Sequence, residues 1–237
     1  MNMRKYAAIV FLSGMFLVCG GADTPLPLLV QWDFTAGNLT SANGKYALRL
    51  RGNTVLEKVS GKTMLRIGMS RNAEGAQFCA LYKELCPQGP LRYEFTVRMR
   101  EPDSPLNMQV LFDSKYSFYN PSSHSGLALV LNRFQNDPRQ YRMTVYAGFA
   151  KGCSLTFYCS KAVRLEEGNR YTLAYEYDGK DTFSFFLDGK KIGAQTRKDA
   201  GPLQAPVKNH GVVGDRFNSG YCHFQGDILS VRIFGKP

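Results

Sequence analysis

The sequence lacks the short residue spacings that mark several common catalytic and metal sites. Its three histidines, His124, His210 and His223, lie far apart, and no HExxH sequence places two of them on one helical turn. No Cys-x-x-Cys pair is present, so a small zinc site is not predicted. No Gly-x-Ser-x-Gly sequence is present either, which leaves a serine hydrolase of the α/β type without support.

Long apolar runs are also scarce. The one clear example, residues 6–18, follows Arg4 and Lys5 and ends just before small residues, an arrangement typical of a secretory signal. It is shorter than the ~20 residues that a membrane-spanning helix needs, and no later stretch could cross a bilayer. We therefore predict a signal peptide over residues 1–22, cleaved after Ala22, and no retained membrane span.

Lipidation of Cys19 is an alternative fate for the N-terminal segment. It is disfavoured because Val18 stands where the lipoprotein peptidase needs a small residue. We expect residues 23–237 to form one domain that is secreted, periplasmic or held at the cell surface.

Acidic residues are in the minority. There are 19 Asp and Glu against 30 Lys and Arg, and the formal charge of +11 includes two units from Arg4 and Lys5 in the predicted signal. The basic residues are scattered along the chain rather than grouped in a stripe, so we do not predict a nucleic-acid partner. A positive surface would favour acidic glycans or an anionic envelope through long-range attraction.

Five cysteines lie outside the predicted signal. An exported protein can keep disulfides, so local Cys79–Cys86 and Cys153–Cys159 pairs are one interpretation, with Cys222 left over. The other interpretation is that several are buried as small apolar residues. The spacing does not decide the pairing.

The dominant pattern in the chain is a period of two. In residues 92–100 the side chains of Tyr93, Phe95 and Val97 alternate with polar ones, which predicts a strand with one buried and one solvated face. The same alternation recurs in three later segments, residues 126–132, 141–147 and 171–177.

Turn residues separate these segments. Asn43-Gly44, Asp178-Gly179 and Asp188-Gly189 are pairs that tolerate the positive φ angles of tight hairpins. No segment shows a helical period with caps. We predict an all-β protein, an antiparallel β-sandwich of the jelly-roll type with very little helix.

Three segments together resemble a known family. Residues 32–50, residues 171–193 and residues 224–237 are similar to the start, middle and end of a laminin-G-like domain, a member of the concanavalin A-like lectin and glucanase jelly rolls. The order and spacing of the three segments carry the resemblance. It implies two curved antiparallel sheets and, in many members, a concave face or rim that binds glycans.

The resemblance also implies a structural calcium in many members, near the paired terminal strands. Asp33 and Asp227 occupy that position in this sequence. Because calcium takes six or more oxygen ligands, two aspartates do not establish a site. Roles at a strand edge or in a turn are the alternative.

A related branch of the same superfold hydrolyses polysaccharides with carboxylates spaced along one strand. The nearest match in this chain is Glu176, Asp178 and Asp181, but Asp178-Gly179 reads as a hairpin turn that would interrupt such a strand. We therefore predict that the protein is not an enzyme.

Two loops are the best candidates for ligand binding, because they combine aromatic faces with polar groups. They are residues 113–126 and residues 214–223. The candidate binding residues are Tyr116, Tyr119, His124, Asp215, Arg216, Asn218 and Tyr221. The alternative is that these aromatic side chains pack the loops onto the sheet.

These observations favour a secreted, non-enzymatic, lectin-like module that binds carbohydrate. The positive charge of the protein would favour acidic glycans as its ligands. A structural or protein-interaction module of the cell envelope is the first alternative. A divergent glycoside hydrolase is the second, and it would need two carboxylates facing one groove.

Overall fold

The structure is a computed structural model, and it describes residues 25–70, 73–101, 104–115, 124–135, 137–217 and 221–236. The predicted signal peptide and the candidate residues Tyr116, Tyr119 and Asn218 lie outside this part of the chain. Within it, no helix has both the length and the apolar character needed to cross a membrane.

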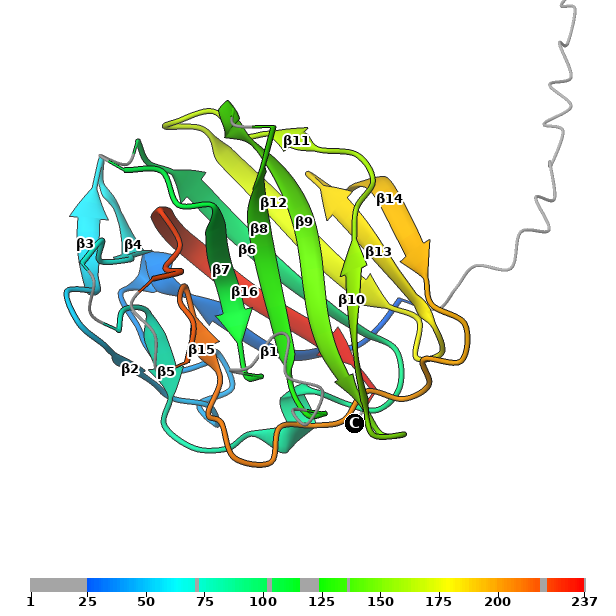
Figure 1. Cartoon of the computed structure of the whole chain (residues 1–237). Coiled ribbons are helices and arrows are strands. Elements are labelled where there is room, and N and C mark those ends of the chain that lie inside the picture. Colours follow the sequence, from blue (N-terminus) through cyan, green and yellow to red (C-terminus); the bar gives the residue numbers. More distant parts are fainter. Residues whose placement is uncertain are drawn as a thin grey trace, which may run out of the picture.

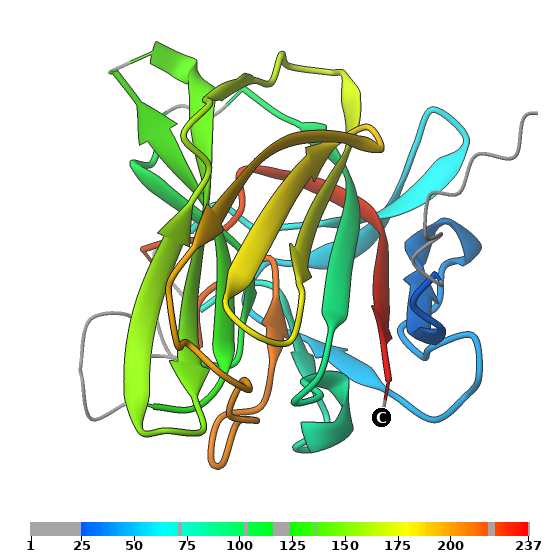
Figure 2. The same cartoon turned by 90° about the vertical axis from the view of Figure 1, so that its right-hand side faces the viewer.

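Two antiparallel sheets make up the fold, stacked as layers that are seen from the front in Figure 1 and from the side in Figure 2. The back sheet has the order β14-β13-β12-β6-β16-β4-β3, and β1 also pairs with β16. Its strands are β1 (Leu28–Asp33), β3 (Val55–Val59), β4 (Lys62–Arg66), β6 (Leu91–Met99), β12 (Arg170–Tyr177), β13 (Thr182–Leu187), β14 (Lys190–Thr196) and β16 (Gly226–Gly235).

The front sheet has the order β10-β9-β8-β7-β15-β5-β2, and β11 also pairs with β9. Its strands are β2 (Leu48–Leu50), β5 (Ala76–Phe78), β7 (Met108–Asp113), β8 (Leu127–Phe134), β9 (Asp137–Phe149), β10 (Cys153–Tyr158), β11 (Val163–Arg164) and β15 (Val212–Val213). The helical content of the described residues is two 3₁₀ turns, η1 (Phe34–Ala36) and η2 (Lys83–Leu85).

The core fills the space between the sheets with the alternate residues that the sequence pattern selects. Trp32 of β1 is fully buried, stacks on Phe78 of β5 at 5.4 Å and donates its indole N–H to the carbonyl of Tyr46. Across the sandwich, the hydroxyl of Tyr175 donates to the carbonyl of Val130 at 3.1 Å. The predicted antiparallel β-sandwich with very little helix is confirmed.

The Asp-Gly pairs form hairpin turns. Asp188 and Gly189 have φ angles of 49° and 78°, as a type I′ turn between β13 and β14 requires. The Asp178 carboxylate accepts three backbone N–H groups of its own turn, from Lys180, Asp181 and Thr182. The glycosidase-like spacing around Asp178 is therefore interrupted by a hairpin turn.

The cysteines do not form the local pairs considered above. All five described cysteines are free thiols, and Cys86 and Cys159 are buried. Cys153 begins β10 and Cys159 directly follows it, so the extended strand holds the two apart by about 20 Å, which no disulfide can span. The five described cysteines are thus free thiols, two of them buried as small apolar residues, and they do not form a disulfide framework.

The outer face of the back sheet differs from the expected solvated surface. Glu94 and Thr96 of β6 are only 7% and 5% exposed, and arginine side chains from β6 and β16 cover Glu94. The basic residues that are scattered along the sequence meet on this face, because alternate residues of paired strands point the same way. They are Lys62, Arg66, Arg92, Arg98, Arg100, Arg170 and Arg232.

Candidate functional site

The outer face of the front sheet carries the outward residues of β8, β9 and β10. Antiparallel register places Asn132 of β8 opposite Arg142 of β9, and Tyr158 of β10 opposite Thr144 of β9. Their neighbours along each strand, such as Leu131 and Met143, point into the core. Local alternation therefore selects which side chains reach this surface, and pairing decides which of them meet.

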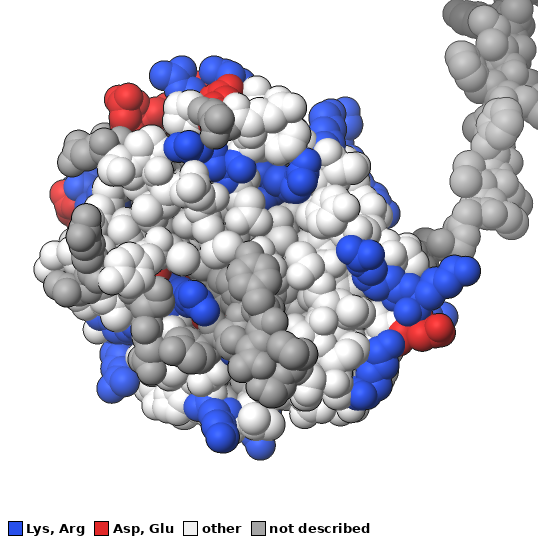
Figure 3. Space-filling view, viewed as in Figure 1, with Lys and Arg blue, Asp and Glu red and all other residues white. Residues whose placement is uncertain are grey.

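These strands form an open groove of about 180 Å³, which we call the front groove. It is lined by Asn132, Arg133, Phe134, Arg142, Thr144, Tyr146, Thr156 and Tyr158. Figure 3 views this face of the molecule: Lys and Arg side chains lie across its upper part, and Asp and Glu side chains appear mainly at the margin.

Arg142 is the central group of the front groove. Its guanidinium carbon lies 4.6 Å from the ring centroid of Phe134 and 5.3 Å from that of Tyr158. The two rings fix the orientation of the cation through contact with its flat face. The Arg142 guanidinium makes no hydrogen bond or ion pair with any described residue. Its Nε is buried, so Nη1 and Nη2 are the donors that face a ligand in the groove.

Polar groups and a flat aromatic surface surround this cation. The Asn132 amide donates to the Thr144 hydroxyl at 2.9 Å, which orients the Asn132 carbonyl as an acceptor. Tyr158 is 41% exposed and is one of the few large apolar or aromatic side chains that are exposed among the described residues. An exposed ring beside fixed donors and acceptors can hold a sugar, whose C–H face is apolar and whose edge is polar.

Next to the groove the same face is covered. Val110, Ala128, Val130 and Tyr146 are buried there as a small second cluster, and Cys222 packs against them. The amide of Val110 donates to the carbonyl of Cys222 at 2.8 Å, so the segment at Cys222 runs beside β7. This cover leaves the front groove, over β8 to β10, as an open part of the face.

The structure brings the bases of the two predicted binding loops together at Asp113. This buried carboxylate accepts from the backbone N–H of Lys115 at 2.7 Å and from that of Phe217 at 2.9 Å. Tyr221 is 71% exposed. The loops therefore share one end of the front sheet, and their role in binding stays a prediction.

Asp215 does not face solvent as a rim residue would. It is fully buried and accepts from the backbone N–H groups of Glu74 and Arg216, at 2.8 and 2.7 Å. Burial raises the pKa of the Asp215 carboxyl to about 7, although these hydrogen bonds and the charge of Arg51 oppose the shift. Arg216 and His124 are partly exposed at the same end of the sheet.

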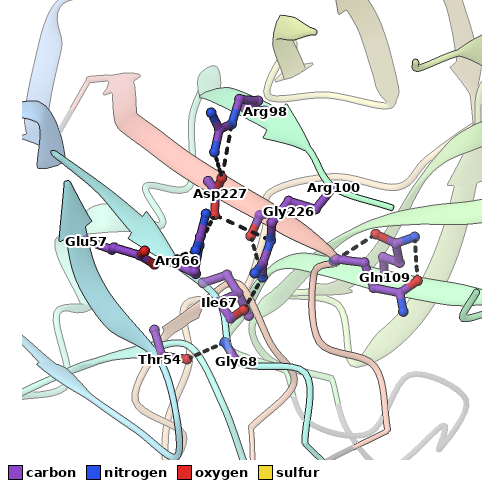
Figure 4. A network of polar contacts seen from close by, with 11 residues as sticks. Thr54, Glu57, Arg66, Ile67, Gly68, Arg98, Arg100, Gln109, Gly226 and Asp227 are labelled. Carbon is purple, nitrogen blue, oxygen red and sulfur yellow. Dashed lines mark hydrogen bonds and ion pairs between the residues drawn. The ribbon is translucent and has the colours of Figure 1, made fainter. Parts of the chain in front are cut away.

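Asp33 and Asp227 are committed to contacts within the chain. The fully buried Asp227 carboxylate is paired with Arg66 at 3.2 Å, Arg98 at 2.6 Å and Arg100 at 3.4 Å (Figure 4). Asp33 caps η1 by accepting from the amide and hydroxyl of Thr35. Three guanidinium groups around Asp227 repel a cation, so these residues do not fit the calcium site that the resemblance implies.

Elsewhere in the described ranges, no group of three or more His, Cys, Asp or Glu side chains is arranged to hold a metal ion. The residues of the front groove were not among the sequence candidates. The alternation along residues 141–147 predicts only that Arg142 and Thr144 lie on the solvated face of a strand, and nothing in the sequence indicates that Phe134 and Tyr158 would flank Arg142. That arrangement depends on the register of β8, β9 and β10.

No protein-family model and no curated protein matches the sequence. Several solved structures match the fold. Domain 4 of AbnA, an extracellular GH43 arabinanase from Geobacillus stearothermophilus, was solved in complex with arabinotriose. It has a TM-score of 0.62 and 10% identity over 89% of this chain and 93% of that domain.

Two further structures have bound partners in their names. The binding domain of botulinum neurotoxin DC in complex with SialylT has a TM-score of 0.57 and 12% identity, over 88% of this chain and 47% of that one. The chain thus spans about half the length of that domain. The CBM40 of Ruminococcus gnavus IT-sialidase, bound to α2,3-sialyllactose, has a TM-score of 0.50 and 11% identity over 72% of this chain and 90% of that one. At these identities the likeness shows the fold alone.

Proposed function

We propose that the protein is a secreted, non-enzymatic carbohydrate-binding module that holds a glycan in the front groove. The observation that carries the proposal is the Arg142 guanidinium, which is held between the rings of Phe134 and Tyr158 and makes no hydrogen bond or ion pair with any described residue. The laminin-G-like assignment and the export signal over residues 1–22 are parts of the same proposal.

The groove chemistry suits a saccharide. The exposed ring of Tyr158 would stack on the apolar face of a sugar, while Asn132 and Arg142 would bind its hydroxyls or a carboxylate. At about 180 Å³ the front groove is smaller than the ~300 Å³ or more of a closed ligand pocket, which suits a chain lying across the surface. Structures of the same fold in complex with arabinotriose and sialyllactose support this type of ligand.

The composition of the groove supports binding rather than hydrolysis. Glycoside hydrolysis generally uses two carboxylates that flank the scissile bond. None of the eight residues that line the front groove is Asp or Glu. A glycan bound there would therefore lack both a general acid and a nucleophile.

A glycan array followed by titration of arabinotriose and α2,3-sialyllactose tests the proposal. Tyr158→Ala should weaken the affinity for the preferred glycan about three- to tenfold, because it removes a stacking surface. Arg142→Gln should weaken it about tenfold or more, because it removes a charged donor. Lys190→Ala, at an exposed turn on the other sheet, is the matched control.

The same titration separates the front groove from the predicted loop site. Loss of binding in Tyr221→Ala, with wild-type affinity in Tyr158→Ala and Arg142→Gln, would move the site to the two predicted binding loops, residues 113–126 and 214–223. Absence of binding to every glycan on the array would instead favour a protein-interaction module.

A further inference from the structure

A second pocket opens on the opposite face, where the back sheet divides. β16 pairs with β4 at Asp227 and Ile228, passes an irregularity at Leu229, and then pairs with β1 from Ser230 to Phe234. Two strands thus share one side of β16 and diverge at Leu229. The divergence leaves a cavity of about 500 Å³, which we call the split pocket.

The split pocket is lined almost entirely by polar residues. They are Gln31, Asp33, Thr35, Gly61, Lys62, Thr96, Arg170, Leu229, Ser230 and Arg232. The side chains of Gln31, Thr96 and Ser230 make no hydrogen bond with any described residue, although Thr96 is only 5% exposed. Their donors and acceptors are therefore available to water or to a ligand with hydroxyl groups.

The charge of the lining is positive. Lys62 and Arg170 are exposed and have no ion pair within the described ranges, whereas Arg232 is paired with Glu94. Arg170 stands directly opposite Arg98, which is paired with Asp227. Asp33 is the one acidic residue of the lining. Two cations without an ion pair outnumber this one carboxylate, and together with the neutral hydroxyl groups they favour an anionic, hydroxylated ligand.

The walls of the split pocket are held in place before a ligand arrives. The ion pairs of Asp227 connect β4, β6 and β16 beside it (Figure 4). On the opposite wall, Asp33 caps η1 through Thr35. Fixed walls lower the ordering cost that a ligand must overcome.

We propose that the split pocket is a second glycan-binding site, selective for a sugar that carries a carboxylate or a sulfate. The site goes beyond the proposed function, because it lies on the other outer face of the sandwich and uses different residues. None of its lining residues is aromatic, so it lacks the stacking surface that single-stranded nucleic acid uses. This absence favours an acidic glycan over a nucleic acid.

Calorimetric titration with two defined probes tests the proposal. A heparin tetrasaccharide presents sulfates and carboxylates, and a tetragalacturonate presents carboxylates only. The double variant Lys62→Gln, Arg170→Gln should bind the preferred probe about tenfold more weakly at low salt. The double variant Lys58→Gln, Lys190→Gln removes the same charge from exposed positions outside the pocket and should bind like the wild type.

Equal weakening in both double variants would mean general attraction to a positive surface and would overturn the proposal. Tyr158→Ala should leave binding of the acidic probe unchanged, so failure of the front groove and failure of the split pocket are separable. Loss of acidic-probe binding in Tyr158→Ala alone would place that ligand in the front groove. A single-stranded DNA octamer is the probe for nucleic acid. If it competes with the tetrasaccharide and the protein binds both with equal affinity, the selectivity for glycans is refuted.

Discussion

Replacement of Asp227 by asparagine tests whether one buried carboxylate holds the outer face of the back sheet together. The side chain is fully buried and lies within 3.4 Å of guanidinium nitrogens of Arg66, Arg98 and Arg100. Asparagine has nearly the same volume and keeps one acceptor oxygen. The substitution therefore removes the negative charge with little change in packing.

The expected cost follows from what the arginines lose. Their side chains are only 22% to 28% exposed, so water compensates their charge poorly. Arg66 keeps its pair with Glu57, whereas Arg98 and Arg100 lose their only carboxylate partner among the described residues. Removing one partner of a buried ion pair typically lowers the free energy of unfolding by about 3–5 kcal/mol. We expect the free energy of unfolding to fall by about 4 kcal/mol, and the Tm by about 10 °C for a chain of this size.

Equilibrium urea unfolding and calorimetry measure this change. Asp33→Asn is the matched control, because Asp33 is exposed and asparagine can still cap η1; we expect a change below about 0.5 kcal/mol. In a double-mutant cycle, Arg98→Met should recover part of the loss in the Asp227→Asn background. A loss below about 1 kcal/mol would refute the reasoning, since it would mean that the network behaves like a surface ion pair.

Three other predictions concern stability and the thiols. Burial raises the pKa of the Asp215 carboxyl to about 7 in the folded protein, whereas the same carboxyl has an ordinary pKa near 4 in the unfolded chain. Between about pH 4 and pH 7 the folded state therefore binds one more proton than the unfolded state does. The free energy of unfolding should thus fall as the pH rises from about 4 to 7, by up to about 1.4 kcal/mol per pH unit, and an Asp215→Asn variant with the wild-type slope would contradict this. Gly189→Ala should cost about 1 kcal/mol because the φ of Gly189 is 78°, whereas Gly89→Ala, in open space and without a positive φ, should cost almost nothing; urea unfolding distinguishes them. In urea without reductant, the five cysteines of residues 25–236 should all react with a thiol reagent, and a lower count would reveal a disulfide.

The strands and turns could be predicted because their signals are local. In residues 183–193, Phe183 and Phe185 alternate with Ser184 and Phe186, and the Asp188-Gly189 pair adopts the positive φ angles that the hairpin needs. Each of these features depends on neighbours within a few residues. The antiparallel β-sandwich follows from many such segments in one chain.

The candidate sites depend on contacts that no local pattern encodes. The front groove needs the register of β8, β9 and β10, which places Phe134 and Tyr158 on either side of Arg142. Composition suggested loops with aromatic residues instead, and of those candidates Asp215 is buried in the structure.

The clearest contrast is on the back sheet. Alternation along residues 92–100 places Arg98 and Arg100 on the outward face of β6, and the amino-acid sequence is sufficient for that conclusion. Their partner Asp227 is 129 residues from Arg98 in the sequence, and it is 161 residues from its third partner, Arg66. Periodicity specifies the face on which a side chain lies, because it is a property of one strand. Which charges then meet, and where the sheet divides to leave a pocket, depends on the pairing of strands distant in sequence.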